Sequence, residues 1–117
     1  ISSAAMRRTW YFTTVIIRAM KEVSVDQVPA DAQLIDVREP DEYAAVRAEG
    51  AVNIPLSEFV ARTDEINPDQ DIYLICKSGG RSAQAGEYLE QARGWDNVIN
   101  VAGGTTAWVE KGLPHQN

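Results

Sequence analysis

Cysteine and histidine are nearly absent from this chain of 117 residues, which contains one of each. A single cysteine cannot form a disulfide within the chain, and one cysteine with one histidine does not make the ligand set of a structural zinc site. We therefore expect no metal and no other cofactor. With 44% hydrophobic residues, the chain has the length and composition of one domain held together by an ordinary core.

Basic residues are scarce beyond the beginning of the chain. Residues 22–117 contain 7 basic and 17 acidic residues, a net charge of −10, whereas residues 1–21 contain four basic residues and no acidic one. A surface this acidic repels the phosphates of DNA and RNA. We therefore expect no nucleic-acid partner.

Long hydrophobic runs are missing as well. The run WYFTTVII at residues 10–17 has eight residues, far fewer than the ~20 that a membrane-spanning helix requires. We interpret residues 1–19 as a flexible N-terminal extension or tag without membrane contact, and residues 20–117 as the domain of a cytoplasmic protein. A membrane-surface or export segment is the alternative interpretation of the extension.

Short apolar runs alternate with helical patterns from about residue 20 onward. Residues 34–37 and 72–75 are continuous apolar runs, which are typical of strands buried on both faces. This alternation predicts an α/β fold in which helices cover both faces of a mainly parallel sheet. The further strands are predicted at residues 23–25, 52–54 and 98–101, and the helices at 40–46, 82–92 and 105–111.

Local signals support two of these helices. Pro40 stands at a first helical position and is followed by Asp41 and Glu42, whose negative charges favour a helix N-terminus. In the helix predicted over residues 82–92, apolar side chains recur at helical spacing, and Gly86 indicates close packing against a neighbouring element.

The single cysteine begins the segment CKSGGRS at residues 76–82, directly after a predicted strand. Ligands of parallel α/β sheets bind at the carboxyl ends of the strands. The two glycines let the backbone turn so that successive amide N–H groups point into one small space, next to a helix N-terminus. With positive charge added by Arg81 and Lys77, this loop should favour the thiolate and lower the pKa of Cys76.

Other interpretations of Cys76 have to be weighed against a reactive thiol. Free cysteine is often buried, so Cys76 also suits the end of a core strand. A nucleotide-binding phosphate loop is disfavoured because the pattern G-x-x-x-x-G-K-[ST] is missing. A Cys–His pair is disfavoured because the one histidine, His115, falls in a terminal segment that we expect to fray.

Three further segments are recognisable: LIDVREPDEY at residues 34–43, GAVNIP at 50–55, and VINVAGGTTAW at 98–108 with GLP at 112–114. Together with CKSGGRS, and in this order, they resemble the single-domain rhodaneses, the thiosulfate sulfurtransferase family. The resemblance covers about residues 22–114, and four ordered segments are far more specific than any one of them. It implies a three-layer fold with a five-stranded, mainly parallel sheet.

The resemblance also implies roles for individual residues. Cys76 would be the nucleophile that carries sulfane sulfur as a persulfide. Asp36 and Arg38 would support the active-site loops, although an ordinary ion-pair network with Glu42 is an equally good interpretation. Arg47 stands where many relatives have histidine, which leaves the preference for an acceptor open. The residues implied to bind substrate are Lys77, Ser78, Gly79, Gly80, Arg81 and Ser82.

The expected function is transfer of sulfane sulfur from thiosulfate, or a similar small anionic donor, to an external thiol or cyanide. The acceptor thiol belongs either to a small molecule or to a protein. One alternative is a persulfide carrier or interaction module without turnover. A second is a cysteine-dependent phosphatase or arsenate reductase, but the related phosphatases have five residues between cysteine and arginine, whereas four separate Cys76 from Arg81.

Overall fold

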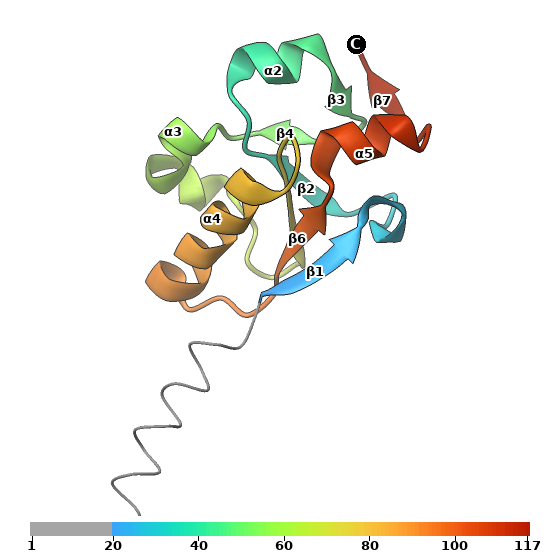
Figure 1. Ribbon diagram of the computed structural model, residues 1–117. Helices are drawn as coiled ribbons and strands as arrows, with labels where there is room; N and C mark the ends of the chain where they lie inside the picture. Colours follow the sequence, from blue (N-terminus) through green and yellow to red (C-terminus); the bar gives the residue numbers. More distant parts are fainter. Residues whose placement is uncertain (1–19) are drawn as a thin grey trace, which may run out of the picture.

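The computed structural model describes residues 20–117, so the expectations for residues 1–19 lie outside the described residues. Strands and helices alternate along this part of the chain (Figure 1). In order they are β1 (Lys21–Ser24), η1 (Val25–Gln27), β2 (Gln33–Asp36), α2 (Pro40–Ala45), β3 (Arg47–Ala48), β4 (Val52–Asn53), α3 (Leu56–Phe59), η2 (Val60–Glu65), β5 (Ile72–Ile75), α4 (Gly80–Tyr88), η3 (Leu89–Arg93), β6 (Val98–Ala102), α5 (Gly104–Glu110) and β7 (His115–Gln116).

Five strands form one parallel sheet in the order β1-β6-β5-β2-β4. The central strand, β5, is the apolar run at residues 72–75, and its neighbour β2 contains residues 34–36 of the run predicted at 34–37. A separate antiparallel pair joins β3 to β7. The predicted α/β fold with a five-stranded parallel sheet is therefore confirmed.

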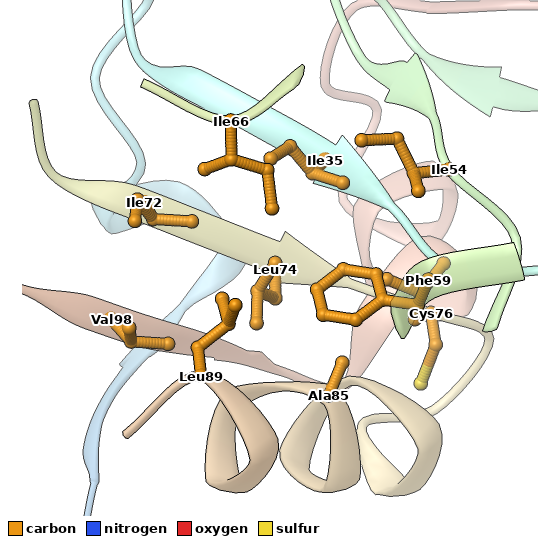
Figure 2. Packing of buried hydrophobic residues seen from close by; sticks show 11 residues of the cluster. Ile35, Ile54, Phe59, Ile66, Ile72, Leu74, Cys76, Ala85, Leu89 and Val98 are labelled. Atoms are coloured by element: carbon orange, nitrogen blue, oxygen red, sulfur yellow. The ribbon is translucent and has the colours of Figure 1, made fainter. Parts of the chain in front are cut away.

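Side chains of β5 alternate between two hydrophobic clusters, one on each face of the sheet. Ile72, Leu74 and Cys76 belong to the cluster that α3 and α4 cover, as Figure 2 shows. Tyr73 and Ile75 belong to the opposite cluster, which contains Trp108 of α5. Because helices cover both faces, the strand needs apolar residues at every position, which explains its continuous apolar sequence.

The helix predicted over residues 82–92 is present, but it begins earlier, at Gly80, and its last part, Leu89–Arg93, is a π-helix. Gly86 faces β6 and the residue before β1, since a Cβ there would meet the side chains of Val98 and Met20. The absence of a side chain thus lets α4 pack closely on the sheet, as the sequence predicted.

Three details differ from the predictions. Val25, expected in the first strand, is the first residue of the 3-10 helix η1. The segment around His115, expected to fray, forms β7 and pairs with Ala48 of β3. The helices α3 and η2 were not predicted, because segments of four to six residues are too short to display a clear period.

No helix within residues 20–117 is both long and apolar enough to cross a membrane.

The first turn of α5 packs directly against the backbone of the cysteine loop. The amide of Thr105 donates to the carbonyl oxygen of Cys76 at 2.8 Å, and the amide of Thr106 donates to that of Lys77 at 3.1 Å. Gly104, just before Thr105, has φ +59°, and a Cβ at this position would collide with the carbonyl oxygens of Cys76 and Lys77. Glycine therefore allows the two segments to meet.

We expect Gly104→Ala to destabilise the protein more than Gly112→Ala. Both glycines have positive φ, so alanine costs about 1–2 kcal/mol of backbone strain at either position. Nothing lies within 4 Å of a Cβ at Gly112, whereas at Gly104 it meets fixed backbone atoms, which adds about 1–3 kcal/mol. Urea denaturation of the two variants measures the difference. Equal losses of unfolding free energy would contradict direct packing of the turn on the loop.

Candidate active site

Cys76 follows β5 immediately, and its sulfur lies at the beginning of α4 (Figure 2). The Gly79 amide donates to Sγ at 3.0 Å, and the Ser82 hydroxyl oxygen lies 3.3 Å from Sγ. Gly79 adopts φ +115°, a conformation that favours glycine, and it caps α4. The loop therefore curls around the sulfur, as the paired glycines predicted.

Burial and hydrogen bonding act on the thiol in opposite directions. The residue is 1% exposed, and this burial raises the pKa of Cys76, because a thiolate loses its hydration there. The hydrogen bond from the Ser82 hydroxyl lowers the pKa, and so do hydrogen bonds from the amides of Ser82, Gly79 and Ser78. The hydrogen bonds prevail, so the pKa of Cys76 lies below the value of an ordinary cysteine, in the direction that the sequence predicted.

The two cations of the loop contribute less to the thiolate than expected. Arg81 forms a two-pronged ion pair with Glu42 of α2, with Nη–Oε distances of 2.7 and 2.9 Å. This partner raises the pKa of Arg81 and balances its charge. Lys77 is exposed and makes no ion pair within the described part of the chain. Amide and hydroxyl donors, rather than full charges, therefore provide most of the stabilisation of the sulfur anion.

Asp36 and Arg38 form a buried ion pair at the end of β2, with exposed fractions of 0% and 4%. Arg38 Nη2 lies 2.7 Å from Asp36 Oδ2 and also donates to the carbonyl oxygen of Val46 at 2.6 Å. The pair thus fastens the end of β2 to the segment between α2 and β3. Glu42, which the ion-pair interpretation included in this network, instead pairs with Arg81.

Arg47 lies in β3, away from the cysteine loop in sequence, and its guanidinium stacks over the ring of Tyr43 at 5.0 Å. The contact attaches β3 to α2 through a cation–π interaction.

Sequence reasoning did not single out Asn100 as a residue near the sulfur. Asn100 is 4% exposed in β6, and its Oδ1 lies 2.6 Å from the Ser82 hydroxyl oxygen. Its Nδ2 donates to Oε2 of Glu22 at 3.0 Å. One signal was present in the sequence: Asn100 is the polar residue within the apolar run VINVA, and a buried amide requires partners.

A pocket of about 420 Å³ opens beside the loop, between α2 and α5. Its surface combines apolar side chains with Lys77, Arg38 and two carboxylates. The residues that line it are Arg38, Glu42, Ala45, Val46, Lys77, Thr105, Thr106, Val109 and Glu110.

Residues 20–111 match the family model described as the rhodanese-like domain. This chain belongs to the rhodanese family. The match covers the sheet, the Cys76 loop and α5, so the resemblance read from four short segments is confirmed over the whole domain.

Individual rhodanese relatives agree with this assignment. A sulfurtransferase from Allochromatium vinosum is 40% identical over 84 residues, which is 72% of this chain and 78% of that protein. A putative sulfur carrier protein from Bacillus subtilis is 37% identical over 99 residues, which is 80% of this chain and 53% of that protein. The crystal structure of a rhodanese-related protein from Thermoplasma volcanium superposes with a TM-score of 0.74 at 29% identity and covers 82% of this chain and 97% of that one.

We expect Glu42→Gln to remove a stabilising interaction that depends on pH. The hydrogen bonds from Arg81 lower the pKa of Glu42 from 4.5 to about 2 in the folded protein. The contribution is therefore complete above about pH 4.5 and is lost as the pH falls toward about 2. At neutral pH the variant should lose about 0.5–1 kcal/mol of unfolding free energy, measured by urea denaturation.

The matched control is Glu58→Gln, which should lose less, because the Glu58 side chain is 54% exposed and Arg62 keeps its second partner, Glu65. A Glu42→Gln difference that stayed constant from about pH 5 to about pH 2 would contradict the assignment.

Proposed function

We propose that this rhodanese is a sulfurtransferase that moves sulfane sulfur from thiosulfate, or a similar anionic donor, to a thiol through a persulfide on Cys76. The observation that carries the proposal is the thiol itself. Its sulfur is buried and accepts hydrogen bonds from loop amides and a hydroxyl, which favour an anionic sulfur without a catalytic base.

In the first step, the Cys76 thiolate attacks the outer sulfur of thiosulfate. A new S–S bond forms, the S–S bond of thiosulfate breaks, and sulfite leaves with the electron pair of that bond. The terminal sulfur of the resulting persulfide carries the negative charge. The donors around the loop suit this species, because amide N–H groups stabilise anionic sulfur without supplying a proton that would quench it.

In the second step, an external thiolate attacks the terminal sulfur, and the Cys76 thiolate leaves. Cyanide does the same in an assay and becomes thiocyanate. The acceptor must come from outside this sequence, which contains no second cysteine. The pocket between α2 and α5 adjoins the loop at Lys77 and offers space for the acceptor.

Arg81 contributes to donor binding in this proposal, but not as a phosphate clamp. Phosphate recognition by arginine typically uses two parallel N–H donors, and Glu42 occupies two such donors of Arg81. Because Glu42 already accepts from both Nη atoms of Arg81, sulfur transfer is favoured over the phosphatase and arsenate reductase alternatives. Lys77, which is exposed, is suited to attract a small anion to the loop in an otherwise acidic molecule.

A persulfide carrier is the second candidate, favoured by the similarity to the putative sulfur carrier of Bacillus subtilis. In this case Cys76 loads sulfur once and delivers it to one protein, with negligible turnover on thiosulfate.

We propose a cytoplasmic location for the protein, because glutathione and thioredoxin keep acceptor thiols reduced there.

Mass spectrometry after exposure to thiosulfate tests the proposal. We expect the wild type to gain one sulfur atom, which cyanide removes, and Cys76→Ser to gain none. The variant Val60→Ala, whose side chain is 62% exposed on η2, is the control and should load as the wild type does. Sulfur loading of Cys76→Ser would overturn the assignment of the nucleophile.

Steady-state kinetics with thiosulfate and a panel of thiols separates the candidates. Multiple turnovers with a small thiol support the sulfurtransferase. A single loading event without turnover supports the carrier. Release of phosphate from an aryl phosphate at a comparable rate would favour the phosphatase.

A further inference from the structure

A chain of polar groups runs behind the Cys76 sulfur to the edge strand β1. The Ser82 hydroxyl oxygen lies 3.3 Å from Cys76 Sγ, 2.6 Å from Asn100 Oδ1 and 3.1 Å from the carbonyl oxygen of Gly79. Asn100 Nδ2 lies 3.0 Å from Glu22 Oε2 and 3.3 Å from the Gly79 carbonyl oxygen. Of these hydrogen-bonded side chains, the proposed sulfur transfer involves Ser82 but not Asn100 or Glu22.

A serine hydroxyl has one proton, so it donates to one acceptor at a time. The sulfur of Cys76, Oδ1 of Asn100 and the carbonyl oxygen of Gly79 therefore compete for the same donor, and Oδ1 of Asn100 is the nearest of the three. The contact with Oδ1, at 2.6 Å, is short for a bond between two oxygens and makes the amide a strong competitor. Ser82 is 0% exposed, so water does not offer a replacement.

Glu22, together with the Gly79 carbonyl oxygen, sets which end of the Asn100 amide faces Ser82, because both accept hydrogen bonds from Nδ2. A carboxylate only accepts hydrogen bonds, so the amide turns its Nδ2 toward Glu22 and its Oδ1 toward Ser82. The sheet creates this arrangement, because Glu22 of β1 and Asn100 of β6 are register partners on neighbouring parallel strands. With the opposite orientation, Nδ2 would donate to the Ser82 oxygen and would no longer compete for its proton.

We propose that Glu22 and Asn100 are positioning residues that control whether the Ser82 hydroxyl donates to Asn100 or to the Cys76 sulfur. The proposal rests on the proposed function, in which this sulfur reacts. While Cys76 is a thiol, Ser82 donates to Asn100 and its oxygen accepts from the S–H group. When the thiol ionises, the Ser82 proton turns to the sulfur and leaves Asn100 Oδ1.

This competition moderates the stabilisation of the thiolate. A sulfur anion that is less strongly hydrogen-bonded has a higher pKa and is the stronger nucleophile, because nucleophilicity rises with basicity. In the persulfide, the charge lies on the outer sulfur, so the Ser82 hydroxyl returns to Asn100. The Ser82 proton stays on its oxygen throughout, and no proton is transferred along the chain of groups.

The test is a pH titration of the thiolate by its ultraviolet absorbance, with the spectrum of the matching Cys76→Ser protein subtracted, so that the one cysteine is followed without the four tyrosines. Ser82→Ala should raise the midpoint by about half a pH unit or more, since a donor to the sulfur is lost. Asn100→Leu should lower it, because Ser82 loses its nearest competing acceptor and keeps only the longer contact with the Gly79 carbonyl oxygen besides the sulfur. Glu22→Ala should lower it by a smaller amount, since Nδ2 of Asn100 is then held only by the longer bond to the Gly79 carbonyl oxygen and the amide turns more easily.

Competition predicts a raised titration midpoint in Ser82→Ala and a lowered one in Asn100→Leu. A general loosening of the loop would instead raise the midpoint in every variant. In the double variant Ser82→Ala/Asn100→Leu, the leucine should add nothing, because the proton under competition is gone. Lys21→Ala, beside Glu22 on the same strand, is the control and should leave the midpoint unchanged. The charge of Arg81, which interacts electrostatically with Cys76, is the same in all variants.

A raised midpoint in Asn100→Leu, or an equal effect of this substitution with and without Ser82, would overturn the proposal. If Asn100→Leu fails to fold, Glu22→Ala decides the matter: a lowered midpoint supports the proposal, and an unchanged or raised one overturns it. The titration needs no sulfur donor. Persulfide loading measured on the same samples therefore reports separately on the proposed function.

Discussion

A sulfur anion inside a protein must receive from nearby donors the stabilisation that it loses with its water, and this requirement governs the structure around Cys76. The donors are backbone amides and one hydroxyl, which have to be held within hydrogen-bond distance of a single atom. The left-handed conformation of Gly79 aims its amide at the sulfur. The turn at Gly104 closes the other side, because the amides that begin α5 bind the carbonyl oxygens of the loop.

Charges near this site are largely neutralised in pairs. Glu42 faces Arg81, and Asp36 faces Arg38. The first pair joins α2 to the beginning of α4, and the second joins the end of β2 to the segment before β3. Both pairs therefore fix the elements around the loop relative to one another, while Lys77 remains as an exposed cation that a small anion can meet.

The fold was predictable because its strongest signals are local. β5 is apolar at every position, β2 contains the apolar pair Leu34-Ile35, and the glycines around Cys76 have no role in a core strand. The competition at Ser82 was not predictable, because it depends on the register between β1 and β6, which places Glu22 beside Asn100 from a distant part of the sequence. The ion pair between Arg81 and Glu42 was missed for a similar reason. In the sequence, Glu42 is only a favourable negative charge near a helix N-terminus, because its pairing with Arg81 depends on how α2 lies against α4.

The alternation of side chains along β5 places Cys76 on the α4 face of the sheet, together with Ile72 and Leu74. Along β2, Ile35 and the following Val37 lie on this face, so Asp36 between them points to the other face. The Cys76 and Asp36 side chains therefore leave the sheet from opposite faces. Insertion of one residue into β5 would turn the thiol away from Gly79 and Ser82 and toward Trp108. The number of residues in this strand thus determines whether the thiol meets its hydrogen-bond donors at all.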